Sequence, residues 1–565
     1  MVSKKNGQKQ KDILMLLVVA AILVLLNFVG AFLFKRFDLT SEKRYTLSAS
    51  TKKLLKELDD VVYIKVYLQG NFNPGFTRLR NETKEILDEY RAYSGDKIEY
   101  EFVNPLENPN KEEVENLEKQ LFQKGIMPEQ VIDRSSQKVS ETYIWPGALV
   151  NYKGHETVWQ IYRKQVGYAQ EQSINNSVQE LEYGLSNSIR KTQIMRKPEV
   201  LFLEGHGELD TIYCADFMNS LTEYYNVSRV KMNNKLYSLK GADAIVIAQP
   251  DSAFTEKEIF LIDQFIMHGG KALWLIDPVY INRDTLNTKG YTLGFKNELN
   301  LDEILFKYGV RLNPLMVQDL QCARVPINVG FKKGQPDFQP FPWMYYPLIL
   351  PVSSHPIVKN LDLIRTEFIG TLDTVFARDV KKTILLQTSK YTKTQPTPTR
   401  INVGMIRYRP DEKQYTNSFQ NMACLLEGRF ESVYKNRIPS AFVQDSAFDI
   451  MDKSKPTRMI VVADGDIAKN EYQRSSGRVM PVGFDSYMNE QFANKTFLLN
   501  CMNYLLDDES LLHLRSREVK LRLLDKKKIG QQASRWKWIN VGLPLAAVIL
   551  FGLIQFYVRK RKYSR

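Results

Sequence analysis

The sequence predicts an α/β protein held at a membrane by one transmembrane helix near each end. Two apolar stretches, residues 13–34 and 538–558, can each cross the roughly 30 Å hydrocarbon core of a bilayer at about 1.5 Å per helical residue. Between them, short apolar strands alternate with helical segments, which is typical of α/β sheets. The 565 residues exceed one hydrophobic core, so several domains are expected.

The net charge of +14 is concentrated beside the two apolar stretches. The tails at residues 1–12 and 559–565 carry +3 and +5, and residues 511–537 carry +7, so the rest of the chain is close to neutral. Basic flanks fit either anionic membrane lipid or simple topological signals. A nucleic-acid partner is not expected, because it would require a basic body.

The first apolar stretch has two interpretations, a cleaved signal peptide or an uncleaved anchor. Val29-Gly30-Ala31 resembles a cleavage site, but the apolar run is long and continues to Phe34, which favours the anchor. The positive-inside rule then puts both termini in the cytoplasm and the body on the periplasmic side of the inner membrane.

Residues 511–537 predict a basic amphipathic juxtamembrane segment. Aromatic membrane-interface anchors are expected at Trp536, Trp538 and Tyr557.

Residues 45–195 predict a small α/β domain. Strands at residues 61–68 and 97–103 flank a helix at residues 77–94, so these two strands should be parallel. A further helix near 111–124, strands near 141–152 and 156–162, and a long helix at 173–195 complete the domain. Arg196-Lys197-Pro198 is the expected boundary.

Residues 198–510 predict a doubly wound parallel sheet. Its four apolar strands are expected at residues 199–203, 242–248, 271–276 and 458–463, with a covering helix at 490–506. Residues 278–457 form an insert within this domain. Its segment 325–351 holds six prolines and is predicted to be irregular or a partner-facing loop, and 391–400 to be an exposed loop.

Polar residues follow the four expected strands directly. The carboxyl ends of parallel strands share one rim of a sheet, where ligands bind at the switch point. A candidate crevice therefore consists of Gly205, His206, Glu208, Asp277, Asp464 and Asp466. The alternative is that these are ordinary turn and cap residues.

Motifs for known catalytic machinery are missing from the sequence. There is no GxxxxGK[ST] loop, no GxSxG elbow and no HExxH pair, so no catalytic residue, metal or cofactor is predicted. Four cysteines, Cys214, Cys322, Cys424 and Cys501, form no CxxC, and their spacing leaves disulfides open. A P-loop ATPase is excluded.

Several short motifs in order resemble the GldG family of membrane-anchored auxiliary subunits of the gliding-motility-associated ABC transporter. They are Tyr45-Thr46-Leu47-Ser48, Phe102-Val103-Asn104-Pro105, Gly205-His206-Gly207-Glu208, Ala242-Asp243-Ala244, Gly269-Gly270-Lys271, Val461-Val462-Ala463-Asp464-Gly465-Asp466 and Phe497-Leu498-Leu499-Asn500. The resemblance implies a flavodoxin-like, GIFT-type central domain without a nucleophilic cysteine. It also implies separate permease and ATPase partners.

Three functions follow as hypotheses. The first is a non-enzymatic transporter subunit whose extracytoplasmic body couples to a permease and an ATPase. The second is an extracytoplasmic module that binds a glycan or peptide through the crevice and the aromatic insert. The third is a hydrolase of the amidotransferase-like class, either degenerate or active. The sequence names no substrate and no stoichiometry.

Overall fold

The structure is a computed structural model that describes residues 14–22, 25, 47–506 and 526–563, apart from gaps at 71, 108–109, 134–139, 163–169, 194–196, 333, 352, 360 and 438–448. The N-terminal tail 1–12, most of the predicted span 13–34 and residues 511–525 of the basic segment lie outside the described residues. The chain divides into two units, Met1–Arg44 with Val519–Arg565, and Tyr45–Glu518.

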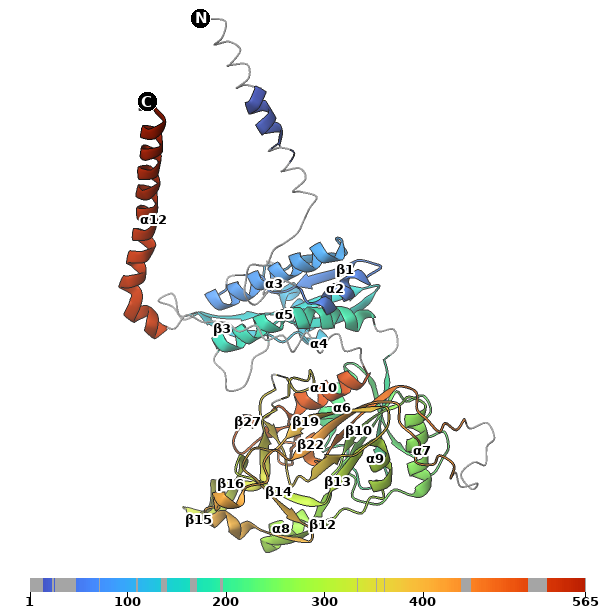
Figure 1. The fold of residues 1–565 in the computed structure, drawn as a ribbon. Coiled ribbons are helices and arrows are strands. Elements are labelled where there is room, and N and C mark those ends of the chain that lie inside the picture. Colours follow the sequence, from blue (N-terminus) through green and yellow to red (C-terminus); the bar gives the residue numbers. More distant parts are fainter. Residues whose placement is uncertain are drawn as a thin grey trace, which may run out of the picture. The chain divides into compact units, whose positions relative to one another are not determined.

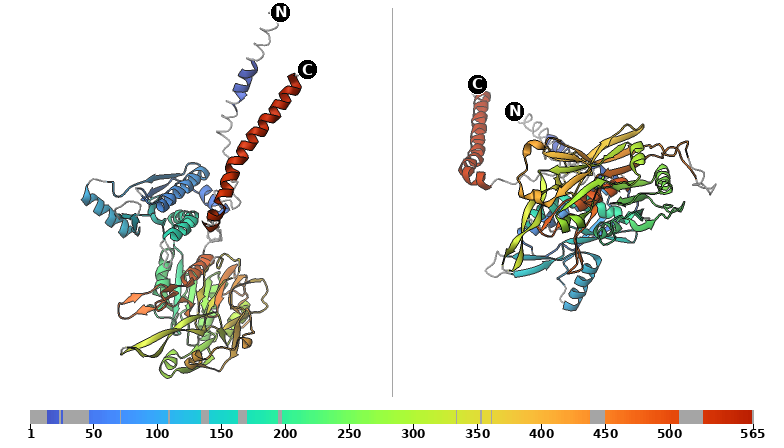
Figure 2. Two further views of the ribbon diagram at one scale, coloured as in Figure 1. Left: turned by 90° about the vertical axis from the view of Figure 1, so that its left-hand side faces the viewer. Right: turned by 90° about the horizontal axis from the view of Figure 1, so that it is seen from below.

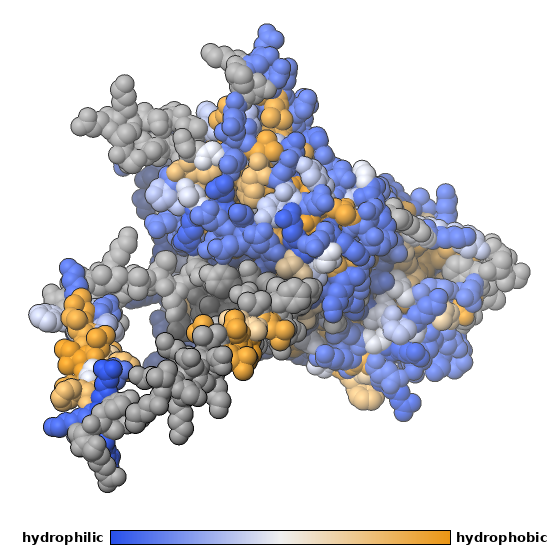
Figure 3. All heavy atoms as spheres, turned by 90° about the horizontal axis from the view of Figure 1, so that it is seen from above, coloured by the Kyte–Doolittle hydropathy of each residue, from blue (hydrophilic) through white to orange (hydrophobic). Residues whose placement is uncertain are grey.

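The first unit contains the long helix α12 (Lys526–Tyr563). Within it, Arg535–Arg561 is the one helix among the described residues that is long and apolar enough to cross a membrane. Its side chains are exposed, and Figure 3 shows them as a hydrophobic group at the left of the view. The second predicted span is thus confirmed as an apolar helix of sufficient length, while the arrangement with two spans stays a prediction.

The second unit begins with a four-stranded sheet in the order β2-β1-β5-β6 (Figure 1). The strands are β1 (Val62–Val66), β2 (Ile98–Phe102), β5 (Gly147–Tyr152) and β6 (His155–Gln160). β1 and β2 are parallel, as predicted, and α3 (Pro74–Ser94) connects them. Helices α2 (Ala49–Lys56), α3 and α5 (Gln170–Gln193) contribute to its hydrophobic core.

Three further elements belong to this part of the chain. Helix α4 (Lys111–Lys124) has the bounds that the sequence predicts. It is followed by a hairpin of β3 (Glu129–Asp133) and β4 (Ser140–Ile144). Ser48 is the N-cap of α2, where its hydroxyl accepts a hydrogen bond from the Thr51 backbone amide.

A seven-stranded sheet organises the rest of the unit, in the order β19-β22-β23-β10-β9-β7-β8. Its strands are β7 (Glu199–Glu204), β8 (Asn226–Lys231), β9 (Ala244–Ala248), β10 (Lys271–Leu275), β19 (Val380–Gln387), β22 (Asn421–Gly428) and β23 (Thr457–Val462). β8, β7, β9, β10 and β23 are mutually parallel, whereas β22 runs opposite to them and β19 pairs antiparallel with β22. The four predicted apolar strands are confirmed, and β8 was not predicted.

Helices cover both faces of this sheet, as Figures 1 and 2 show. Side chains alternate along each strand, so that Val200 and Phe202 pack with α6 (Ala215–Thr222) and α10 (Asn494–Leu506). Leu201 and Leu203 pack on the other face with α7 (Glu256–Met267) and α9 (Asp302–Tyr308). This alternation explains the continuous apolar strands, since both faces are buried.

The four predicted strands are parallel, but the prediction of a parallel sheet holds only in part, because the insert adds two strands through antiparallel pairs. β22 is buried on both faces and pairs with β23, and β19 then pairs with β22. The sheet is therefore mixed. The insert as a whole is largely β-structure, with strands from β11 (Val279–Ile281) to β22.

The prediction of irregular structure at residues 325–351 is also wrong. Here β15 (Cys322–Lys332) and β16 (Gln335–Ile349) form a long antiparallel ribbon, with Pro326 opposite Pro340. Most of the ribbon is two-stranded, because β17 (Ile364–Arg365) pairs only with Leu348 and Ile349. Prolines fit such edges, where many backbone amides have no partner strand.

The expected loop at residues 391–400 is likewise two strands, β20 (Thr392–Pro396) and β21 (Thr399–Asn402). They join different sheets, because β20 pairs with β14 (Leu315–Asp319) and β21 pairs with β12 (Tyr291–Lys296). Pro396 and Pro398 lie where β20 leads into β21. Neither proline indicates in the sequence which strand β20 or β21 pairs with. Smaller elements complete this region: α8 (Arg283–Lys289), β13 (Val310–Asn313) and β18 (Thr371–Thr374).

Candidate functional site

A cavity of about 240 Å³ lies where the parallel strands end. Gly207 follows β7, Gln249 follows β9, Asp277 follows β10, and Asp466 follows β23. The segment of β11 and α8 lines it as well. The full lining is Gly207, Gln249, Pro250, Asp251, Asp277, Val279, Tyr280, Ile281, Asn282, Arg283, Asp284, Asn297, Phe368, Asp466 and Lys469. Parallel strands bring these loops to one rim because their carboxyl ends all face the same way.

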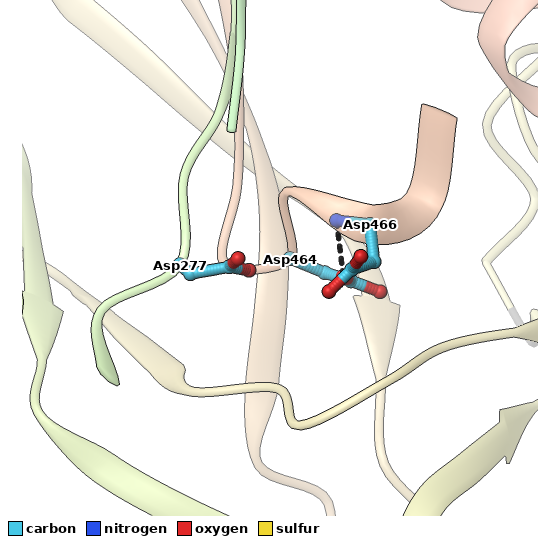
Figure 4. Close-up of side chains that lie close together, drawn as sticks. All are labelled: Asp277, Asp464 and Asp466. Atoms are coloured by element: carbon cyan, nitrogen blue, oxygen red, sulfur yellow. Dashed lines mark hydrogen bonds between the residues drawn. The ribbon is translucent and has the colours of Figure 1, made fainter. Parts of the chain in front are cut away.

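Three aspartates of the predicted crevice gather at this cavity. One carboxylate oxygen from each of Asp277, Asp464 and Asp466 lies within 4.8 Å of the other two (Figure 4). Asp277 accepts hydrogen bonds from the backbone amide of Gly465 at 2.5 Å and from Nε2 of Gln249 at 2.9 Å. Asp464 Oδ1 accepts from the backbone amide of Asp466 at 3.0 Å. The turn after β23 therefore places two carboxylates beside the one after β10.

Burial and mutual repulsion disfavour the ionised forms of two of these groups. Burial, aided by the negative charge of Asp466, raises the pKa of Asp277 to about 7. Burial also raises the pKa of Asp464 well above its usual value, with Asp277 and Asp466 adding to the effect. Like charges in a desolvated site must either share protons or bind a cation.

Two cations neutralise part of the cluster. The Arg283 guanidinium contacts Asp466 through Nη2 and donates to Oε2 of Glu367 through Nη1 at 2.5 Å. Lys469 Nζ lies 3.4 Å from Oδ1 of Asp466. Glu367 is also 3.1 Å from Nη2 of Arg365. Burial opposes ionisation of Glu367, but the charges of Arg283 and Arg365 outweigh it and lower its pKa to about 2.

His206 and Glu208 do not line the cavity. The His206 ring is buried and stacks on Phe254 at 3.8 Å between centroids. Its Nε2 lies 3.0 Å from Oε2 of Glu258, and its Nδ1 lies 3.4 Å from Oε1 of Glu208. Burial lowers the pKa of His206, but the two carboxylates outweigh burial and raise it overall. The group is a closed ion-pair cluster, which we call the His206 cluster (His206, Glu208 and Glu258).

The predicted crevice thus separates into two places. Asp277, Asp464 and Asp466 are brought together, whereas His206 and Glu208 belong to the neighbouring cluster, and Gly205 lines no described cavity. Gly207 lines the cavity instead: its φ is +73°, and a Cβ there would lie 1.7 Å from Oδ1 of Asp251. Only glycine fits this turn.

Sequence reasoning missed the residues that surround the aspartates. Arg283, Glu367 and Lys469 stand in no motif, Gln249 is a strand-end residue that the candidate crevice did not include, and the pattern around Glu258 indicates only a helix. The described lining of the cavity contains no serine, threonine, cysteine or histidine, so it holds no serine or cysteine nucleophile paired with histidine. The four cysteines are free, and three of them are buried. The aromatic residues Trp536, Trp538 and Tyr557 are exposed on α12.

Residues 197–501 match the family model of an ABC-type uncharacterized transport system, and this match covers more than half of the chain. The chain belongs to this family. All residues that line the cavity fall within the matched range. Residues 41–151 match a separate model, a domain of unknown function (DUF7088).

Two similar proteins, one matched by sequence and one by solved structure, accompany the family match. An "Uncharacterized protein" of Borreliella burgdorferi is 22% identical over 547 residues, which are 93% of this chain and 94% of that protein. The mmIFT52 N-terminal domain is 14% identical, with a TM-score of 0.32, over 55% of this chain and 98% of that one. Family membership makes the chain a transport-associated component, and helix Arg535–Arg561 indicates membrane association.

Proposed function

We propose that the chain is a non-enzymatic, membrane-anchored subunit of an ABC transporter of the gliding-motility type, and that its extracytoplasmic body contacts permease and ATPase chains. One observation carries the proposal: a family domain of transport systems at residues 197–501 is followed in the same chain by the exposed apolar helix Arg535–Arg561. That helix has 27 residues, about 40 Å at 1.5 Å per residue, which is longer than a bilayer core.

Other chains must supply both the ATPase and the pathway. The sequence contains no Walker A loop, and one or two apolar helices with few polar residues make a poor route for a solute. The contribution of this chain is then geometric. Anchoring at both ends raises the effective concentration of a weak contact, to about millimolar for short linkers.

The strand order supports the finer comparison with GldG. Counted along the chain, the five parallel strands of the large sheet lie in the order second, first, third, fourth, fifth. This is the order of flavodoxin-like sheets, in which ligands bind at the carboxyl ends of the strands. β22 and β19 extend that arrangement at one edge through antiparallel pairs.

Co-purification of the full-length protein tests the proposal. Membranes are solubilised in a mild neutral detergent, and the proteins retained with the tagged chain are identified by mass spectrometry. We expect a permease and an ATPase. A chain whose spans at 13–34 and 538–558 are exchanged for one cleavable signal should fold but lose both. Retention of both partners by that variant at the wild-type yield would overturn the role of the anchors.

A matched variant separates tethering from recognition by the helix itself. Residues 538–558 are replaced by a leucine–alanine helix of equal length, with Trp536 and the basic tail kept. If the span is only a tether, this variant keeps its partners. Absence of permease and ATPase from the wild-type preparation would contradict the proposal as a whole.

Labelling of intact cells tests the topology. Phe376 is 90% exposed, so Phe376→Cys in a Cys322→Ser background presents one accessible thiol on the body. A membrane-impermeant maleimide should label it in intact cells, because the body is expected outside. The control variant Ser3→Cys should react only after lysis. The reverse pattern would place the body in the cytoplasm.

A further inference from the structure

The cavity at the strand ends holds more buried acid than base. Arg283 and Lys469 pair with Asp466, and Arg283 and Arg365 pair with Glu367. Among the described residues, no lysine or arginine forms a salt bridge with Asp277 or Asp464. Asp251 and Asp284 add two more carboxylates to the lining. The negative charge that Asp277 and Asp464 carry when they ionise therefore has no described lysine or arginine in a salt bridge to balance it.

Asp464 supplies a second and independent observation. Its side chain is fully buried, and its Oδ2 has no hydrogen-bond partner. Buried carboxylate oxygens are almost always satisfied by a donor, a water molecule or a metal ion. Its Oδ1, in contrast, accepts from the Asp466 amide, so the turn holds the carboxylate in place. The orphan oxygen belongs to Asp464, which Figure 4 shows between Asp277 and Asp466.

We infer that Asp277, Asp464 and Asp466 bind one hydrated divalent cation of the Mg²⁺ or Ca²⁺ class at the inner end of this cavity. Carboxylate oxygens are the ligands that such hard cations prefer. Oxygens bound to one Ca²⁺ at 2.3–2.6 Å lie at most about 5 Å apart, and those bound to Mg²⁺ at most about 4 Å. The limit of 4.8 Å among the three oxygens is compatible with the first and requires slight tightening for the second.

The cavity provides the rest of the coordination sphere. Asp277 and Asp466 face it, whereas Asp464 lies behind them. At about 30 Å³ for each water molecule, a volume of 240 Å³ holds about eight, enough to complete six to eight ligands. The bound cation would join the turn after β10 to the turn after β23, and it would leave the pairs of Arg283 with Asp466 and Glu367 intact.

Direct binding to the full-length protein tests this inference. The protein in neutral detergent is treated with EDTA, exchanged into chelator-free buffer, and titrated with Mn²⁺ by electron paramagnetic resonance and with Mg²⁺ and Ca²⁺ by calorimetry. Weak protein sites for Ca²⁺ have Kd values of about 10⁻⁴–10⁻³ M, so titration to about 10 mM covers the range. We expect one saturable site per chain, and the calorimetric arms decide which cation occupies it more tightly.

Two variants localise the site. Asp464→Asn should weaken Mn²⁺ binding at least about tenfold, the range seen when a metal site loses a supporting group. Its thermal stability without cation should equal or exceed that of wild type, because a buried carboxylate is removed. The matched control is Asp251→Asn, a carboxylate of the same cavity outside the group of three, which should bind like wild type.

Several outcomes would overturn the inference: no saturable binding of Mn²⁺, Mg²⁺ or Ca²⁺ to wild type, unchanged binding by Asp464→Asn, or equal loss in Asp251→Asn. The last would show a diffuse acidic surface in place of a site. If Asp464→Asn does not fold, Asp277→Asn takes its place, and the wild-type titration decides the matter independently of both.

Discussion

The His206 cluster and the aspartate cavity lie at the carboxyl ends of parallel strands of one sheet, yet they differ in charge balance and access. In the His206 cluster, one ring faces two carboxylates, and Glu258 also accepts hydrogen bonds from the amide and hydroxyl of Thr255 at 3.1 and 2.7 Å. In the cavity, three carboxylates face one another and one oxygen is unsatisfied. A position directly after a strand is therefore not enough to make a binding site. A binding site also needs carboxylates that no cation pairs with and an opening to solvent.

The largest expected effect comes from breaking the closed cluster. Glu258→Leu removes one of the two carboxylates that face the buried His206 ring, and it removes the capping box of α7. Removing one member of a buried ion pair costs about 3–5 kcal/mol. Urea unfolding should show a loss near the lower end of that range. Glu256→Leu, an exposed position on the same helix, is the control and should change the free energy of unfolding by less than about 0.5 kcal/mol.

A smaller loss is expected from the cavity's own ion pair. Arg283→Met removes the cation between Asp466 and Glu367. The cost should be about 1–3 kcal/mol, below the usual value for a fully buried pair, because water in the cavity solvates the remaining carboxylates. Mn²⁺ should also bind more tightly to this variant. A loss of unfolding free energy as large as that of Glu258→Leu would show that the cavity and the His206 cluster do not differ in their tolerance of a lost partner.

Glycine substitutions in the turn between them should cost about as much as Arg283→Met or less. Gly207→Ala introduces a Cβ 1.7 Å from Oδ1 of Asp251 at a φ of +73°, and we expect a loss of about 2 kcal/mol in unfolding free energy. Gly205 also has a positive φ, but a Cβ at that position would meet no side chain or backbone of a distant residue within 4 Å. Gly205→Ala should therefore cost less, and equal losses would show that the contact with Asp251 is unimportant.

The most gradual effect is the pH dependence of the His206 cluster. The pKa of His206 is raised, so its stabilisation is complete below about 6.5, its unfolded value, and is lost as pH rises through the folded pKa. The pKa values of Glu208 and Glu258 are lowered, so their stabilisation is present above about 4.5 and is lost as pH falls through the folded values.

Unfolding free energies measured from pH 4 to 9 should thus decline on the alkaline side with a slope of at most about 1.4 kcal/mol per pH unit for this one proton. His206→Gln should flatten that decline. A decline that persists unchanged in His206→Gln would assign it to another group.

The local elements were largely predictable. β7, β9, β10 and β23 are apolar runs bounded by polar turns, and the pattern identified all four within about two residues. Thr255 is a cap by its sequence context, and its hydroxyl accepts a hydrogen bond from the Glu258 amide. Such features depend on neighbouring residues alone. The strands of the insert were not predicted, because the prolines of β15 and β16 indicated irregular structure.

The candidate site was only half predictable. The rule that parallel strands share a rim correctly brought Asp277, Asp464 and Asp466 together. It could not separate His206 from them, since side-chain direction and the packing of Phe254 decide which residues face the cavity. Nor could it find Arg283, which stands 84 residues from Glu367 and 183 from Asp466.

The sequence by itself determined the apolar helix near the C-terminus, the alternation of strands and helices, and the turn residues at the strand ends. These follow from hydrophobic periodicity and local backbone preference, which act over a few residues. The tertiary structure alone decided that β22 and β19 extend the sheet through antiparallel pairs, that His206 is enclosed by two glutamates, and that the three aspartates lie together with two of them lacking a salt bridge within the described part of the chain. Each depends on long-range pairing and burial, and electrostatic energies become large only after distant residues have been desolvated together.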